Sequence, residues 1–328
     1  MLSLVASLAC FADELVLKNG IRVQGEITAA DFEKVTIVTA AGKPMAYKRD
    51  EIKTITRSEP ESFAKAQSLL ANGDYDGAIG LYEQAAKGTQ NAWHVENARA
   101  RLIECYCASG QWDKAAQTYL ALAKASPSSL FLTYVPVPKN SGQVKTEALG
   151  SLDKAAEGLM GLPAAAARAV KCAGFIVADK PADARRELDA LAAIKDPRAA
   201  KLSTACQAHL LVSQKQHDKA LELLRGPVAN NDGSESPWLA FWQGSCYLAK
   251  SDHARAALAF LRAPVLDPQF SLIAGDCLFM AGHCFDKLGQ KDKALAAYRE
   301  VVEKYPVSRF WSEAKQSTGP SQSKMKGN

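Results

Sequence analysis

The residues best able to do chemistry lie close together in GDCLFMAGHC, residues 275–284. This segment holds Asp276, Cys277, His283 and Cys284, residue types that serve as nucleophiles, general bases or zinc ligands. The two cysteines are seven residues apart, about two helical turns, and together with His283 they do not complete a zinc site. Hydrolase or thiol chemistry at Cys277, His283 and Cys284 is therefore a third interpretation, behind two that involve no catalysis.

The remaining candidates for chemistry are scattered. The sequence has no GxSxG, HExxH, Walker-type glycine loop or CxxC pair, the motifs of common hydrolase, metalloprotease, nucleotide and redox sites. Cys105 and Cys107, in CYC, lack the spacing and the second pair of a zinc site. The histidines share no metal-ligand spacing; they are His94, His209, His217, His253 and His283. We predict that the protein is not an enzyme and holds no metal and no cofactor.

The composition is that of an ordinary globular protein. Of the 328 residues, 48% are hydrophobic and 23% are charged, with a net charge of +5. This length suits two or three domains. The basic residues are interspersed with Asp and Glu, so they form no strong footprint for nucleic acid or anionic lipid. We expect no nucleic-acid partner and no transmembrane segment.

The first twelve residues read as an export signal. LSLVASLA is apolar and made of small residues, and CFA before Asp13 suits cleavage after Ala12. The segment has no Lys or Arg, which a signal shortened at its start would explain. Residues 1–12 therefore predict a periplasmic or secreted protein. The alternative is a packed terminus in a cytoplasmic protein.

Residues 13–57 have the alternation of β-strands. ELVLKNGIRVQGEI places two strands around Asn19-Gly20, a strong hairpin signal, and three further short strands follow. Five strands in so short a stretch predict a small, highly curved barrel with Gly25 at a tight bend. With its LKNG…G pattern, the stretch resembles the small Sm-like or SH3-like barrel modules of some bacterial envelope proteins.

From Ser58 onward the sequence repeats a helical pattern. Around Gly110, Tyr106 lies four positions before, Ala115 five after and Tyr119 nine after. A turn-tolerant residue ends the first helix, Ala permits two helices to cross closely, and the aromatic residues fill the space between helices. The same layout recurs around other turn residues, which are Gly73, Asp179, Lys215, Ser251 and Gly289.

This layout resembles the tetratricopeptide repeat, a 34-residue helix–turn–helix unit. The resemblance implies a mainly α fold, a right-handed superhelix of about six repeats after the small five-stranded barrel. The predicted units are 59–92, 96–129, 165–198, 201–234, 237–270 and 275–308. The predicted packing positions are Tyr106, Gly110, Ala115, Tyr119, Gly244, Ala256, Gly282, Ala294 and Tyr298.

An insert and a tail complete the predicted organisation. Repeats 1–2 occupy residues 58–129 and repeats 3–6 occupy residues 165–308. Between them, residues 130–164 begin with the proline-containing SLFLTYVPVPKNSG and continue as one more helix. We expect either a loop packed over the superhelix or occupation of the protein's own groove or barrel by Leu130, Phe131, Leu132 and Tyr134. The polar residues 309–328 predict a disordered tail.

The same resemblance implies that the first helix of each repeat lines a concave groove. In the fourth to sixth units this places aromatic side chains and histidines on adjacent inner helices, where they predict a hydrophobic hot spot for a partner. The candidate groove residues are His209, Trp238, Phe241, Trp242, Phe279 and His283. The alternative is that one or both tryptophans fill the space between repeats.

We therefore expect a non-enzymatic protein–protein interaction scaffold of the cell envelope. It would hold a protein or peptide segment in the concave groove, with the barrel as a second contact surface or a means of homo-oligomer formation. The second interpretation is a cytoplasmic adaptor whose barrel binds RNA or a protein partner. Repeat folds serve many functions, so this step depends on analogy.

Overall fold

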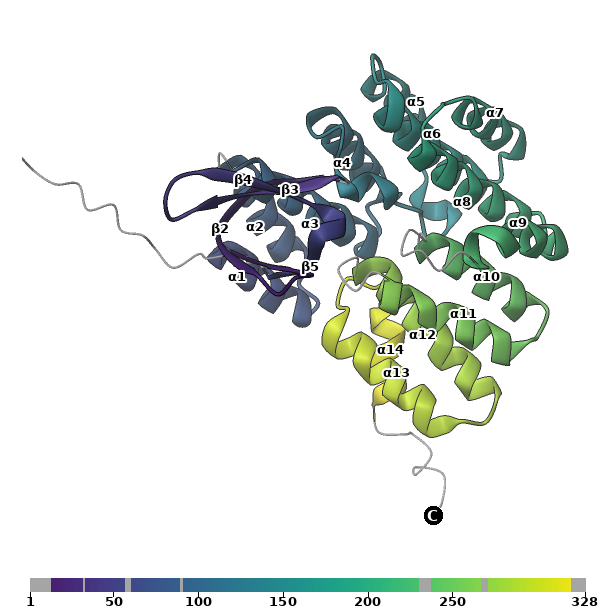
Figure 1. The fold of residues 1–328 in the computed structure, drawn as a ribbon. Helices are drawn as coiled ribbons and strands as arrows, with labels where there is room; N and C mark the ends of the chain where they lie inside the picture. Colours follow the sequence, from purple (N-terminus) through teal and green to yellow (C-terminus); the bar gives the residue numbers. More distant parts are fainter. Residues whose placement is uncertain are drawn as a thin grey trace, which may run out of the picture.

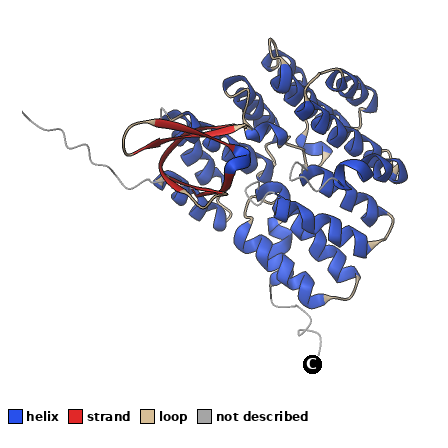
Figure 2. Cartoon of the chain, in the orientation of Figure 1, coloured by secondary structure: helices blue, strands red, loops and turns tan. Residues whose placement is uncertain are grey.

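A small sheet packs against one end of a curved array of helices. The structure is a computed structural model that describes residues 13–31, 33–56, 60–88, 91–229, 237–266 and 271–319. Figure 1 shows the array bending round until its last helices lie near its first. Figure 2 shows the strands gathered at the N-terminal end and helices elsewhere. The predicted signal segment, residues 1–12, lies outside the described residues.

The N-terminal strands form an antiparallel sheet in the order β4-β3-β2-β1-β5. Their bounds are β1 Asp13–Leu17, β2 Arg22–Ala30, β3 Lys34–Thr39, β4 Pro44–Lys48 and β5 Ile52–Thr56. The predicted hairpin joins β1 to β2: Gly20 has a φ of 88°, and the Ile21 N–H donates to Asn19 Oδ1 at 3.0 Å. A Cβ on Gly25 would lie 2.2 Å from the Val38 carbonyl oxygen, so only glycine fits there.

The sheet is open, and the prediction of a closed barrel is wrong. Among the described strands, β4 and β5 are the two edges, joined by the short turn η1 Arg49–Glu51 without pairing to each other. Alternate residues Leu15, Val23, Ile27, Val35 and Ile37 form one apolar face, which Trp93 of the helical array covers. Because a helix residue completes this core, closure by the strands themselves is not needed to exclude water.

Within the described residues, each predicted repeat contains one helix pair. The pairs are α1 Glu61–Ala71 with α2 Tyr75–Gly88, α3 Ala92–Ala108 with α4 Trp112–Ala125, α6 Gly161–Val177 with α7 Pro181–Ala192, α8 Pro197–Ser213 with α9 His217–Ala229, α10 Pro237–Ala249 with α11 His253–Leu266, and α12 Ser271–Lys287 with α13 Lys291–Lys304. The insert adds η2 Leu130–Thr133, η3 Ser141–Gln143 and α5 Thr146–Ala155. None of these described helices has the length and apolarity that crossing a membrane requires.

The turn between the helices of each pair has the backbone that the repeat pattern predicts. All six marker residues have positive φ, a region that L-residues other than glycine rarely adopt. Three are glycines, and the other three are the positive-φ non-glycine residues of the described chain: Asp179 at 56°, Lys215 at 58° and Ser251 at 59°. The register read from the sequence is therefore confirmed at the turns, even where glycine is replaced.

The predicted packing positions lie where helices meet. A Cβ on Gly244 would lie 2.6 Å from the Phe260 ring, and one on Gly282 would lie 2.6 Å from the Tyr298 ring. Gly110 forms a turn with a φ of 78°. The other positions are buried; they are Tyr106, Ala115, Tyr119, Ala256, Ala294 and Tyr298. Small residues at the crossings thus let aromatic residues from the partner helix enter.

The C-terminal residues are ordered further than the sequence predicts. Residues 311–318 form α14, Trp311–Thr318, so the predicted disordered tail from residue 309 is wrong for this stretch. Trp311 and Ala314 are buried, and a Cβ on Gly73 of the first repeat would lie 3.2 Å from the Trp311 ring. The Tyr75 hydroxyl donates to the Pro306 carbonyl at 2.9 Å. The first and last repeats are therefore in contact; residues 320–328 lie outside the described chain.

Replacing Lys215 by glycine should stabilise the protein. Lys215 is exposed and its φ is 58°, so the substitution relieves left-handed backbone strain. We expect the free energy of unfolding to rise by about 1 kcal/mol, measured by urea denaturation. Lys215→Ala removes the same charge but keeps Cβ, and should give no such gain; equal gains in both variants would contradict the argument.

Candidate partner-binding groove

Four of the six predicted groove residues form one aromatic cluster, contributed by α8 and α10. His209 stacks on Trp242 with ring centroids 4.1 Å apart, and Trp242 stacks on Trp238 at 5.5 Å. Phe241 meets Trp238 edge-on at 5.4 Å and Trp242 at 4.9 Å. All four side chains belong to the interior, with Phe241 the most accessible at 9%.

The insert covers this aromatic cluster. Val135 and Val137 lie against His209, Trp238 and Trp242, and a space of only about 20 Å³ is left between them. Such a volume holds no more than about one water molecule. His209, Trp238 and Trp242 are therefore covered rather than open to a partner, because Val135 and Val137 of residues 130–139, the groove segment, lie against them.

The other two predicted residues lie apart from the aromatic cluster. Phe279 is half-buried and stacks on Phe310 at 4.8 Å, with Tyr298 at 5.3 Å. His283 is also half-buried, and its burial together with Lys287 lowers its pKa. In the described part of the chain, no ring contact joins either residue to the cluster. The six residues do not form a single surface.

Repeat side chains hold the backbone of the groove segment. The Tyr119 hydroxyl donates to the Leu132 carbonyl, and Trp112 Nε1 donates to the Pro136 carbonyl at 2.8 Å. Leu132 is fully buried, whereas Phe131 reaches the sheet and stacks on Trp93 at 6.4 Å. The insert thus packs on the repeat helices, as both expectations require, and of the four residues expected to enter the groove or barrel Phe131 contacts the sheet core.

An ion pair between Arg309 and Asp276 lies beside the aromatic cluster. Their side chains are only 6% and 0% exposed, and Arg309 Nε donates to Asp276 Oδ2. Asp276 Oδ1 also accepts from Ser308 Oγ at 2.8 Å and from the Arg309 backbone N–H at 2.9 Å. The guanidinium lies over the rings of Trp238 and Phe241, 5.8 and 5.9 Å from their centroids.

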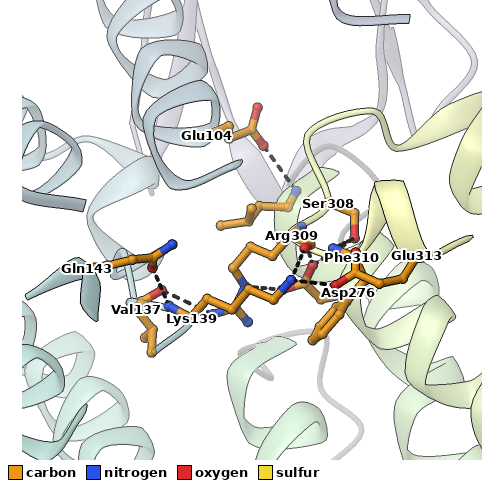
Figure 3. Close-up of polar contacts among 10 residues, drawn as sticks. Glu104, Val137, Lys139, Gln143, Asp276, Ser308, Arg309, Phe310 and Glu313 are labelled. Carbon is orange, nitrogen blue, oxygen red and sulfur yellow. Dashed lines mark hydrogen bonds and ion pairs between the residues drawn. The ribbon is translucent and has the colours of Figure 1, made fainter. Parts of the chain in front are cut away.

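The same arginine connects the C-terminal repeat to the groove segment. Arg309 Nη1 donates to the Val137 carbonyl at 3.1 Å. Lys139 Nζ donates in return to the Arg309 carbonyl and to Glu313 Oε1, both at 2.7 Å. Figure 3 shows these residues converging from the insert and from the C-terminal helices. The network fixes the groove segment at its C-terminal end.

A second buried carboxylate joins the second repeat to α12. Glu104 Oε1 accepts from the Leu272 backbone N–H at 3.4 Å, at the start of α12. Glu104 also pairs with Arg101 at 2.7 Å, and its side chain is 2% exposed. Figure 3 shows Glu104 above Arg309, on helix α3. Helices α3 and α12, far apart in sequence, are therefore joined by a charged side chain.

Sequence reasoning missed the central role of Arg309 and misread Asp276. Arg309 falls in the segment assigned to the tail, and Asp276 was a candidate for catalysis. A signal was present: Asp276 is the single charged residue in the otherwise apolar SLIAGDCLFMAG. A buried carboxylate needs a cation and hydrogen-bond donors. An aspartate in an apolar helix therefore predicts a basic side chain packed against it.

The cysteines of the candidate thiol site are buried thiols with raised pKa values. Cys277 and Cys284 are fully buried; burial raises the pKa of Cys284 to about 11 and that of Cys277 well above its usual value. The thiolate is the reactive form of cysteine, so both side chains are the poorly reactive thiol at neutral pH. Within the described residues, no group of three or more His, Cys, Asp or Glu is placed to hold a metal.

Removing the Arg309 guanidinium should strongly destabilise the fold. In Arg309→Met, Asp276 keeps its charge in the interior without a counterion, which costs about 3–5 kcal/mol. The measurement is urea denaturation of the wild type, both single variants and the double variant with Asp276→Asn. The Arg309→Met loss should be much smaller in the Asp276→Asn background; equal losses in both backgrounds would show that the pair is not coupled.

His209 should make the protein less stable in acid. Burial, together with the positive charge of Arg309, lowers the pKa of His209 from 6.5 to about 3. Between these values the unfolded chain binds a proton that the folded chain does not, so the free energy of unfolding falls as the pH falls. The slope from this group is at most about 1.4 kcal/mol per pH unit.

Comparison with His209→Phe isolates this contribution, because phenylalanine can stack on Trp242 but does not titrate. Denaturation of both proteins from pH 7 to pH 4 gives the difference in slope. We expect the wild type to lose stability faster than the variant below about pH 6.5. If stability falls equally with pH in both proteins, His209 binds its proton over the same pH range in the folded and the unfolded protein.

Family models identify repeats in three stretches of this chain. Tetratricopeptide repeat models match residues 69–131, 207–271 and 276–308. A tetratricopeptide repeat protein from Parabacteroides merdae is 14% identical, with a TM-score of 0.39 and coverage of 79% of this chain and 97% of that one.

A signal-transduction ATPase with numerous domains and a tetratricopeptide repeat sensor, from Pyrococcus horikoshii, is 11% identical. Its TM-score is 0.39, and the match covers 82% of this chain and 46% of that one. Comparison with curated proteins gives no match. The family models show tetratricopeptide repeats in three stretches of this chain, residues 69–131, 207–271 and 276–308.

Proposed function

We propose that this protein is a non-enzymatic protein–protein interaction scaffold of the cell envelope, whose concave face holds an extended polypeptide segment. The observation that carries the proposal is the groove segment itself. Residues 130–139 are a length of chain that belongs to no helix pair, and Leu132, Val135 and Val137 of this segment are buried against repeat helices.

The chemistry of these contacts is that of peptide recognition. Trp112 and Arg309 donate to backbone carbonyls of the groove segment, while apolar side chains enter the surface between them. Main-chain hydrogen bonds that supply affinity, combined with pockets for alternate side chains, are a common way to bind an extended peptide. Tetratricopeptide repeats are suited to this use because stacked helix pairs form a long concave surface.

The envelope location is proposed from the sequence of residues 1–12, which has the apolar and small residues of an export signal. The right-handed sense of the superhelix and a homo-oligomer remain part of the proposal. In support of self-association, β4 and β5 are the edges of the described sheet, and sheet edges present unpaired backbone groups.

Cell fractionation and N-terminal sequencing test the location. We expect a C-terminally tagged protein in the envelope fraction, with a mature N-terminus near Asp13. An intact Met1 in the cytosolic fraction would exclude the envelope part and favour the cytoplasmic adaptor.

Site-specific photo-crosslinking in cells tests the interaction. Asn140, exposed beside the groove segment, takes the photoreactive residue, and Leu258, 67% exposed on α11, serves as the matched control. We expect a discrete crosslinked protein from position 140 and not from position 258. Identical patterns from both positions, or none from position 140, would contradict binding at the concave side.

A further inference from the structure

The groove segment has the chemistry of a peptide ligand. Its sequence is LFLTYVPVPK, in which the buried Val135 and Val137 each precede a proline. Proline fixes its own φ, and the residue before it is driven to extended backbone. Residues 135–138 are accordingly outside the helices and strands. Such a segment has little conformational freedom left to lose on binding.

Four residues of the groove segment each meet a chemically suitable group elsewhere in the chain; they are Val135, Pro136, Val137 and Lys139. Val135 and Val137 meet the aromatic cluster, and the carbonyls of Pro136 and Val137 accept from Trp112 and Arg309. Lys139 follows, with its ammonium between Glu313 Oε1 and the Arg309 carbonyl and 4.8 Å from the Phe310 ring centroid.

The hydrogen bonds to the segment are available to other sequences. They use main-chain carbonyls, which every residue possesses, so they do not require the residues of the insert. The groove also has an unused donor: no acceptor among the described residues pairs with Trp238 Nε1, which is buried beneath the segment. A buried donor without a partner is costly, and a different occupant that placed a carbonyl there would satisfy it.

The groove segment is joined to the rest of the chain by accessible residues. Pro127 and Ser128 are exposed before it, and Asn140 and Ser141 are exposed after it. These links let the segment leave the groove without breaking a helix pair, since the pairs end at Ala125 and begin again at Gly161.

We propose that the concave face is a peptide-binding site specific for an extended segment of the order apolar–proline–apolar–proline–basic, and that residues 135–139 occupy it in cis. A partner carrying such a segment competes with the insert. This inference rests on the proposed interaction function and names the chemistry of the partner. The tethered segment occupies the groove in most molecules, so a partner can bind only the fraction in which the groove is open. The apparent Kd of the partner is therefore its intrinsic Kd divided by that fraction.

Binding of a synthetic peptide tests the site. The probe is TYVPVPKN, residues 133–140, with a fluorescent label, and the host is a variant in which residues 133–139 are replaced by glycine and serine at constant length. We expect saturable binding by fluorescence anisotropy. The intact protein should bind at least about tenfold more weakly, because its own segment competes.

Two matched peptides test the subsites. Val137→Asp places a charge against the aromatic cluster, and Lys139→Glu places an anion against Glu313; each should weaken binding at least about tenfold. Equal binding of all three peptides, or no binding to a variant that keeps its helical circular dichroism, would overturn the proposal.

A second measurement avoids dependence on the folding of that variant. Protease sites inserted after Pro127 and after Asn140, at the exposed links, allow the groove segment to be released from the intact folded protein. Native mass spectrometry should show the released segment still bound, and excess unlabelled TYVPVPKN should exchange with it. Departure of the segment without rebinding would overturn the proposal. If these tests fail while position 140 still crosslinks to a partner, the proposed peptide sequence is wrong, but the proposed scaffold function is not contradicted.

Discussion

The structure depends on the buried ion pair between Arg309 and Asp276. Two charges removed from water are tolerable only when each satisfies the other and the remaining hydrogen-bonding groups find partners. Asp276 meets this condition through Ser308 and the Arg309 backbone N–H, and the guanidinium through the Val137 carbonyl. Electrostatics thus fixes helix α12, the turn before α14 and the groove segment relative to one another.

The apolar contacts around this pair follow from it. With Arg309 held over Trp238 and Phe241, the aromatic cluster has a cation on one side and valines on another. Cation–π contact gains strength where water is excluded, and the groove segment excludes it. The segment is therefore both a ligand of the arginine and the cover that makes the arginine's other contacts effective.

Local features could be predicted from the sequence because they depend on a few neighbouring residues. The turns at Asp179, Lys215 and Ser251 are examples: none is glycine, yet the spacing of surrounding alanines and aromatic residues placed each one, and each has positive φ. The hairpin at Asn19-Gly20 is another case, since its geometry is set by two residues. Short-range periodicity also located all the helix pairs.

Long-range features could not be predicted in the same way. Helical periodicity indicates which side chains face the concave side, but it does not say what covers them; the contact between Arg309 and Val137 spans 172 residues. The open sheet shows the same limit. Its strands were predicted correctly, but Trp93, which completes its core, belongs to helix α3, outside the sheet. For the same reason the sequence left open whether Trp238 lines a groove or fills the space between repeats.

Contact between the first and last repeats changes how the array can move. In an open repeat array each repeat contacts only its neighbours. The end repeats have one face without a neighbour, so they need a polar outer face. Here α14 places Trp311 against the turn at Gly73, and Tyr75 bonds to the Pro306 carbonyl. Each end thus serves as the other's cap. Stretching the array would therefore have to break these contacts between its ends, a cost that an array with separate ends does not have.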